Sequence, residues 1–126
     1  MAGVSRAARL LVLFVAALSW ASPAAVAGDV DKGRRLAEVH CARCHVIGDF
    51  NRMGGIGSTP SFQGLKTLAD WRERFRTFYA RPPHLAFIRV EGIAPRTKLP
   101  AYAAEIKLTL DDVEDVFAFV KTLAAR

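Results

Sequence analysis

The residues best suited to chemistry lie together in the segment Cys41-Ala42-Arg43-Cys44-His45. Two thiols at positions i and i+3, followed directly by a histidine, have the spacing of a c-type haem attachment site. Each thiol can add to one vinyl group of the porphyrin, because one backbone turn matches the separation of the two vinyls. His45 would then lie beneath the iron and offer an imidazole nitrogen as an axial ligand.

Three other interpretations of this segment fit less well. A thioredoxin-like redox pair needs a preceding strand and a βαβ pattern, which the sequence around Cys41 lacks. A zinc site would need a fourth ligand nearby. A disulfide between Cys41 and Cys44 would leave His45 without a role. The segment therefore favours haem attachment.

The first 27 residues have the pattern of a secretory signal peptide. Arg6 and Arg9 precede an apolar run at residues 10–18, and small residues at positions 25 and 27 predict cleavage after Ala27. An uncleaved anchor is the alternative, but the run is shorter than the ~20 apolar residues of a membrane-spanning helix. Because haem is attached to such motifs outside the cytoplasm, the two signals together predict a periplasmic protein.

Cleavage of 27 of the 126 residues would leave 99, enough for one small domain at 28–126. Loss of Arg6 and Arg9 lowers the formal net charge from +6 to +4. A mildly basic exported protein predicts partners with acidic protein surfaces. We expect no nucleic-acid partner, and membrane contact only through partner complexes.

Two helices are predicted at the ends of this domain. Residues 29–40 carry acids at the start and bases further on, with Gly33 in the middle. A glycine costs a helix interior about 1 kcal/mol relative to alanine. We therefore expect Gly33 to mark the close approach of a helix from the far end of the chain. That helix should begin at the capping box Thr109-Leu110-Asp111-Asp112.

A middle helix is predicted over residues 67–81. Thr67 and Asp70 have capping-box spacing, and Pro82-Pro83 would end the helix. One face is a largely aromatic stripe at helical spacing, expected to pack around the haem: Leu68, Trp71, Phe75, Phe78 and Tyr79. The other face carries three arginines, either as a solvated surface or as a docking patch: Arg72, Arg74 and Arg76.

The segments on either side of this helix are predicted to be loops. Residues 49–60 are rich in glycine and show no helical period. At the end of that loop, we expect the Pro60 carbonyl to accept a hydrogen bond from the His45 imidazole, which would orient the ligand. Residues 84–96 are interpreted as extended loop, because no second strand is evident for residues 85–90 to pair with.

Taken together, these features resemble a monohaem class I cytochrome c over nearly all of residues 28–126. Gly33 matches the helix-contact glycine of that family, Val116 and Phe119 match the residues that cross it, and the segment around Pro60 matches the one holding the proximal histidine. Ala37 replaces the family's contact aromatic. The resemblance implies an all-α cytochrome c fold, with crossing terminal helices, a middle helix and loops wrapped around one covalent haem c.

One position departs from the family pattern. Leu99-Pro100 stands where the resemblance places the distal methionine, and leucine has no lone pair for iron. The remaining donors are Met53, which the resemblance places on the proximal side, and His84, which opens the loop leading to Leu99. We predict His84 as the sixth ligand, with Met53 or no protein ligand as alternatives.

These features predict a one-electron carrier between periplasmic redox partners rather than an enzyme. Two fixed axial ligands let a haem change charge with little rearrangement. The alternative is a five-coordinate haem that binds gases, senses them or acts as a weak peroxidase. A haem subunit of a larger oxidoreductase complex would change the partner but not the chemistry.

We predict that haem is bound covalently through Cys41 and Cys44. Haem staining of a denaturing gel should label the unmutated protein, because thioether bonds survive denaturation. Replacing both cysteines with alanine should abolish the stained band, while immunoblotting reports the amount of protein. Full staining of that double variant would refute the assignment.

Overall fold

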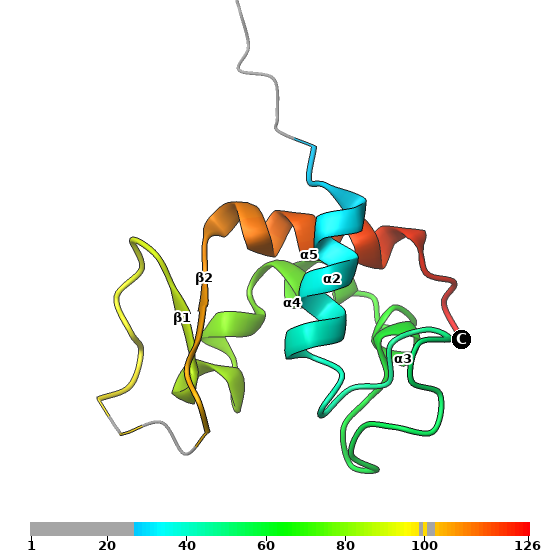
Figure 1. The fold of residues 1–126 in the computed structure, drawn as a ribbon, viewed down its shortest axis with the longest axis horizontal. Coiled ribbons are helices and arrows are strands. Elements are labelled where there is room, and N and C mark those ends of the chain that lie inside the picture. Colours follow the sequence, from blue (N-terminus) through cyan, green and yellow to red (C-terminus); the bar gives the residue numbers. More distant parts are fainter. Residues whose placement is uncertain (1–26, 99, 101–102) are drawn as a thin grey trace, which may run out of the picture.

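The computed structural model describes residues 27–98, 100 and 103–126. The predicted leader, apart from Ala27, and Leu99 lie outside the described residues. No helix within the described part of the chain is long and apolar enough to cross a membrane. Figure 1 shows helix α5 extended across the molecule, with α2 crossing it and the two strands at one end.

The two terminal helices form where the sequence predicts them. Helix α2 spans Val30–His40, and Asp29 caps its start by accepting a hydrogen bond from the Lys32 amide at 2.9 Å. Helix α5 spans Leu110–Thr122 and begins at a complete capping box between Thr109 and Asp112. The helices cross as predicted (Figure 1), and a Cβ added to Gly33 would overlap the Asp115 carbonyl. Gly33 is therefore the close-contact point of the fold.

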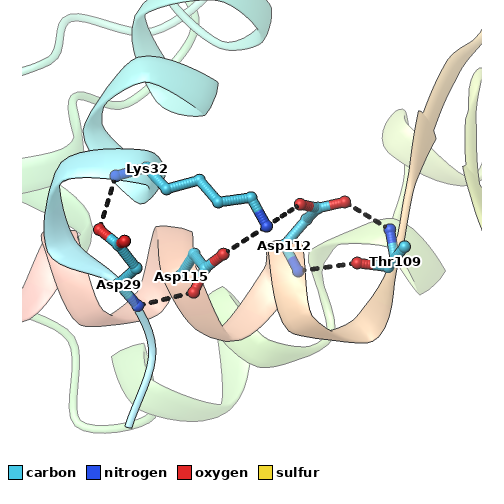
Figure 2. A network of polar contacts seen from close by, with 5 residues as sticks. All are labelled: Asp29, Lys32, Thr109, Asp112 and Asp115. Carbon is cyan, nitrogen blue, oxygen red and sulfur yellow. Dashed lines mark hydrogen bonds and ion pairs between the residues drawn. The ribbon is translucent and has the colours of Figure 1, made fainter.

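A polar network ties the start of α2 to the first turns of α5 (Figure 2). The Lys32 ammonium lies 2.7 Å from an Asp112 oxygen and 2.8 Å from an Asp115 oxygen. The Asp29 amide donates to the other Asp115 oxygen at 2.6 Å. Asp115 is only 6 % exposed, so its charge is paired and hydrogen-bonded rather than left alone in the core.

The described core has two parts. The first surrounds the α2–α5 crossing and is referred to below as the crossing cluster: Ala37, Ile47, Phe62, Phe75, Val116, Phe117, Phe119 and Val120. The second lies between the strands and the start of α5 and is referred to as the strand cluster: Ile88, Val90, Leu108 and Val113. Leu36 packs against both parts, so α2 joins the two halves of the core.

The predicted start of the middle helix is wrong. A short helix, α3, spans Phe62–Leu65, and the backbone turns on through Thr67. The Thr67 hydroxyl donates to the Gly64 carbonyl at 2.8 Å, so the residue closes α3 instead of capping a new helix. Helix α4 begins only at Trp71, and Asp70, its N-cap residue, makes no side-chain capping bond.

The predicted end of that helix is also too late. Helix α4 spans Trp71–Arg76, and a separate 3₁₀ helix, η1, covers Phe78–Ala80. At the break, the Thr77 hydroxyl donates to the Glu73 carbonyl at 2.7 Å. Such back-bonding by a threonine bends helices, so the helix changes direction before the prolines are reached.

The expectation of unpaired extended loop after His84 is also wrong. The 3₁₀ helix η2 covers His84–Ala86, and strand β1, Ile88–Val90, pairs in parallel with strand β2, Ile106–Leu108. Each strand is three residues long, and parallel pairing requires a long connection, which leaves no hairpin signal in the sequence. The pair adds little strand to an otherwise helical fold, which confirms the predicted all-α class.

We predict that Gly33→Ala destabilises the haem-loaded protein by about 1–3 kcal/mol, because the new methyl group overpacks the crossing. Alanine is the better helix former by about 1 kcal/mol, so a loss of stability can only come from the clash. Gly57→Ala is the matched control, since a Cβ there meets nothing within 4 Å. Chemical denaturation followed by far-UV circular dichroism measures both. A Gly33→Ala midpoint equal to that of the control would show that the crossing tolerates a side chain.

Candidate functional site

The two cysteines and His45 lie in a tight turn that continues directly from α2. Cys41 caps the helix, with its amide 2.8 Å from the Ala37 carbonyl. The amides of Cys44 and His45 both donate to the Cys41 carbonyl, at 3.1 and 2.9 Å. Both cysteines are free thiols and partly buried. Because α2 is held by α5, the turn has a defined place against the core.

The surroundings of Cys41 argue against a thiolate role. Burial, with a smaller contribution from Cys44, raises the pKa of the Cys41 thiol to about 12. A reactive or metal-binding cysteine depends on its thiolate, which such an environment disfavours. The surroundings of Cys41 therefore do not favour a reactive thiolate that cycles between thiol and disulfide.

His45 makes the hydrogen bond expected for it. Its Nδ1 lies 2.7 Å from the Pro60 carbonyl oxygen, which can only accept, so Nδ1 carries the proton. Burial lowers the pKa of His45, and the bond to Pro60 offsets part of this effect. A neutral ring protonated at Nδ1 leaves Nε2 with its lone pair free, which is the form that binds a metal. That His45 and Pro60 serve a haem iron in this way remains a prediction.

Asn51 anchors the turn, a role that the sequence pattern did not predict. Its Oδ1 accepts from the Ile47 amide at 2.7 Å, and its Nδ2 donates to the carbonyls of Ala42 and His45 at 3.0 and 2.9 Å. One side chain thus satisfies three backbone groups around the histidine. An asparagine in a glycine-rich loop is an ordinary turn residue, so nothing in the sequence around Asn51 indicates this role.

The glycine-rich loop folds back over the same turn. The Ile56 amide donates to the Cys44 carbonyl at 2.9 Å. Gly55 adopts a φ of +78°, and a Cβ at this residue would come within 3.1 Å of the Cys44 carbonyl oxygen and the Val46 nitrogen. Glycine is needed here both for its backbone conformation and for its lack of a side chain. The loop therefore covers the Cys44–Val46 backbone.

The structure brings His84 opposite His45. The two imidazole centroids lie 5.9 Å apart, and the ring planes are within 12° of parallel. His45 contacts Phe62 of the crossing cluster, whereas His84 contacts Phe78 and Phe87 beside the strand cluster. Burial, with a smaller contribution from His45, lowers the pKa of His84 to about 4. The ring is therefore neutral at neutral pH.

The other residues considered as donors lie elsewhere. Met53 is 99 % exposed on the loop that covers the His45 turn. His40 is exposed at the end of α2. Within the described part of the chain, no group of three or more His, Cys, Asp or Glu side chains is arranged to hold a metal ion. Among these candidates, His84 is the one whose ring the structure brings beside His45.

Comparison with known protein families agrees with this fold and site. The sequence model of the cytochrome c family matches residues 30–124, which include every helix and strand described above. The chain therefore belongs to the cytochrome c family, whose members usually carry electrons. Comparison with curated proteins and with solved structures found no significant match.

The described residues fit the cofactor of this family, covalently bound haem c. Cys41 and Cys44 have the spacing of its attachment, and His45 presents a free imidazole nitrogen beside them. On the opposite side, Nδ1 of His84 is buried without a hydrogen-bond partner among the described protein atoms. A buried polar atom of this kind calls for a partner that the protein itself does not supply.

We predict that Asn51→Ala lowers the stability of the holoprotein by about 2–4 kcal/mol, because three hydrogen bonds of about 0.5–1.5 kcal/mol each are lost. It should also lower the yield of haem-stained protein. Arg52→Ala is the control, since Arg52 makes only an exposed ion pair with Asp49, worth about 0–1 kcal/mol. Guanidinium denaturation and haem staining measure the two effects. Equal stability of the two variants would show that Asn51 does not anchor the turn.

Proposed function

We propose that this protein is an exported electron carrier that passes single electrons between redox partners in the periplasm, after cleavage of its leader behind Ala27. The observation that carries the proposal is the pair of imidazoles facing each other beside two haem-attachment cysteines. Haem c supplies the one-electron couple, and the protein supplies a fixed environment for it. Export rests on the sequence pattern of residues 1–27 alone.

The packing around the two histidines supports electron transfer over catalysis. His45 is oriented by Pro60, and Asn51 bonds to the backbone carbonyl of His45 itself. On the other side, Phe78 and Phe87 enclose the His84 ring at centroid distances of 5.6 and 5.9 Å. Imidazole rings held in this way would move little when the charge of a haem iron bound between them changes by one.

Basic side chains at the end of α3 and on α4 and α5 support an acidic partner. Lys66 and Arg72 lie over the Trp71 ring, at 5.1 and 4.5 Å from its centroid. Lys121 lies over Phe117 at 5.2 Å. We call Lys66, Arg72 and Lys121 the basic patch. Positive charge held on an aromatic surface would guide an acidic redox protein toward this side.

Only part of the arginine face predicted for the middle helix is available for docking. Arg74 pairs with Asp70 at 2.8 Å, and Arg76 pairs with Glu114 at 3.0 Å. These two arginines are partly neutralised on the surface, so Arg72 is the member of that face that contributes most to the basic patch.

A five-coordinate haem for gas binding or weak peroxidase activity is the second candidate. His84 also carries this alternative, because a buried neutral imidazole beside the haem could serve as a distal acid–base group instead of a ligand. The two functions differ in whether the reduced protein binds an added small ligand such as carbon monoxide. An electron carrier with two protein ligands on its iron would bind it poorly, whereas a gas-binding protein would bind it readily.

We predict a reversible one-electron couple for the mature holoprotein in cyclic voltammetry on a carboxylate-coated electrode, with no catalytic current when peroxide is added. At low salt, Arg72→Glu should slow electron exchange several-fold, because the charge reversal weakens docking to the anionic surface. Arg35→Glu, an equal change at an exposed site on α2, should have a smaller effect. Irreversible reduction or strong peroxide turnover would contradict the carrier function, and equal effects of both variants would reject the basic patch.

A further inference from the structure

The feature of the fold that says most about the iron site is the half-buried His84 ring beside His45. His84 begins η2, directly after the prolines, and its ring lies near the His45 imidazole, which comes from the other half of the core. The two rings are near-parallel, with their centroids 5.9 Å apart, so two nitrogen bases lie close together. Two such bases facing across a gap form a pair of axial donors for a haem iron.

The surroundings of His84 give it no protein partner for this role. Phe78 meets the ring edge-on at 81°, and Phe87 lies at 60° to it, both through apolar surface. Its Nδ1 is buried, with no hydrogen bond to any described protein atom. Leaving a buried polar group unpaired costs about 1–3 kcal/mol. A bound group that interacts with this nitrogen would remove that cost.

The backbone that carries His84 is held firmly. The Arg89 guanidinium on β1 donates to the carbonyls of Leu85, Ala86 and Ile88, each at 3.2 Å. The same guanidinium pairs with Glu105 at 2.9 Å, beside β2. Charge-assisted bonds of this kind are stronger than neutral ones. One side chain thus fixes η2 against the two-stranded sheet, so His84 has a defined position.

We propose that His84 is the second axial ligand, giving the haem iron bis-histidine coordination by His45 and His84. This inference rests on the proposed function as a haem electron carrier and specifies the coordination of the same site. Met53 is a poor competitor, because its side chain is almost fully exposed on the loop that covers the His45 turn. The resemblance to cytochromes c places the usual methionine at Leu99, and leucine lacks a donor atom.

Two spectroscopic properties follow from bis-histidine coordination. The ferric protein should be low-spin, and the ferrous protein should bind carbon monoxide poorly, because both axial positions are filled. The potential should also lie below that of a histidine–methionine haem, since thioether ligation raises it.

The test uses the mature holoprotein and its variants. Visible absorption and electron paramagnetic resonance of the ferric state should show a low-spin iron in the unmutated protein. His84→Ala should convert it to high-spin and open the ferrous form to carbon monoxide, and added imidazole should restore the low-spin spectrum. His40→Ala is the matched control, because this histidine is exposed at the end of α2, and its spectra should not change.

A second variant covers the case in which His84→Ala does not fold. His84→Met keeps the pocket filled and offers a thioether, so it should remain low-spin and titrate at a higher potential. A high-spin unmutated protein, or a His84→Ala spectrum identical to the unmutated one, would overturn the inference. A spin change on Met53→Leu instead would assign the site to Met53.

The outcomes separate this inference from the proposed function. Reversible voltammetry of a protein whose spin state does not depend on His84 would reject the ligand and leave the carrier intact. Irreversible voltammetry of a protein that becomes high-spin on His84→Ala would reject the carrier and leave the ligand intact.

Discussion

The contact between the Gly33 backbone and the Asp115 carbonyl is the constraint on which the rest of this structure depends. It lets α2 and α5 approach without intervening side chains, and the Lys32 bridge to Asp112 and Asp115 holds their ends together. The haem-attachment turn begins where α2 ends, so its position is set by that crossing. A side chain at Gly33 would displace not only a helix but also both cysteines and His45.

The site lies where two separate apolar clusters meet. His45 contacts the crossing cluster through Phe62, and His84 contacts Phe78 and Phe87 beside the strand cluster. In a small domain, a large apolar cofactor between two such halves supplies the contact area that the chain alone lacks. The same packing that builds the two clusters also brings aromatic rings against His45 and His84.

The roles of residues that act on the backbone close to them in sequence could be predicted from the sequence. Thr109 and Asp112 form the capping box that their spacing predicts, and Gly33 lies at the predicted crossing. The same spacing at Thr67 and Asp70 failed, because Thr67 already closes α3 by donating to Gly64. A capping pattern shows which hydrogen bonds a side chain can make. Whether the side chain caps the next helix or closes the preceding one depends on where the preceding helix ends. Parallel pairing of β1 with β2 was missed for a related reason, because two three-residue strands far apart in sequence carry no mutual signal.

The sequence by itself determined two properties of this protein: two thiols and a histidine at the spacing of haem attachment, and an all-α fold with crossing terminal helices. These properties depend on residue type and on separations of a few positions, which a sequence states directly. Only the tertiary structure decided that the His84 and His45 ring centroids lie 5.9 Å apart, that Arg89 fixes the turn carrying His84, and that Asn51 bonds three backbone groups around His45. Each of these depends on how segments from different parts of the chain pack in space. Contacts of that kind arise only when the whole chain folds around a common core.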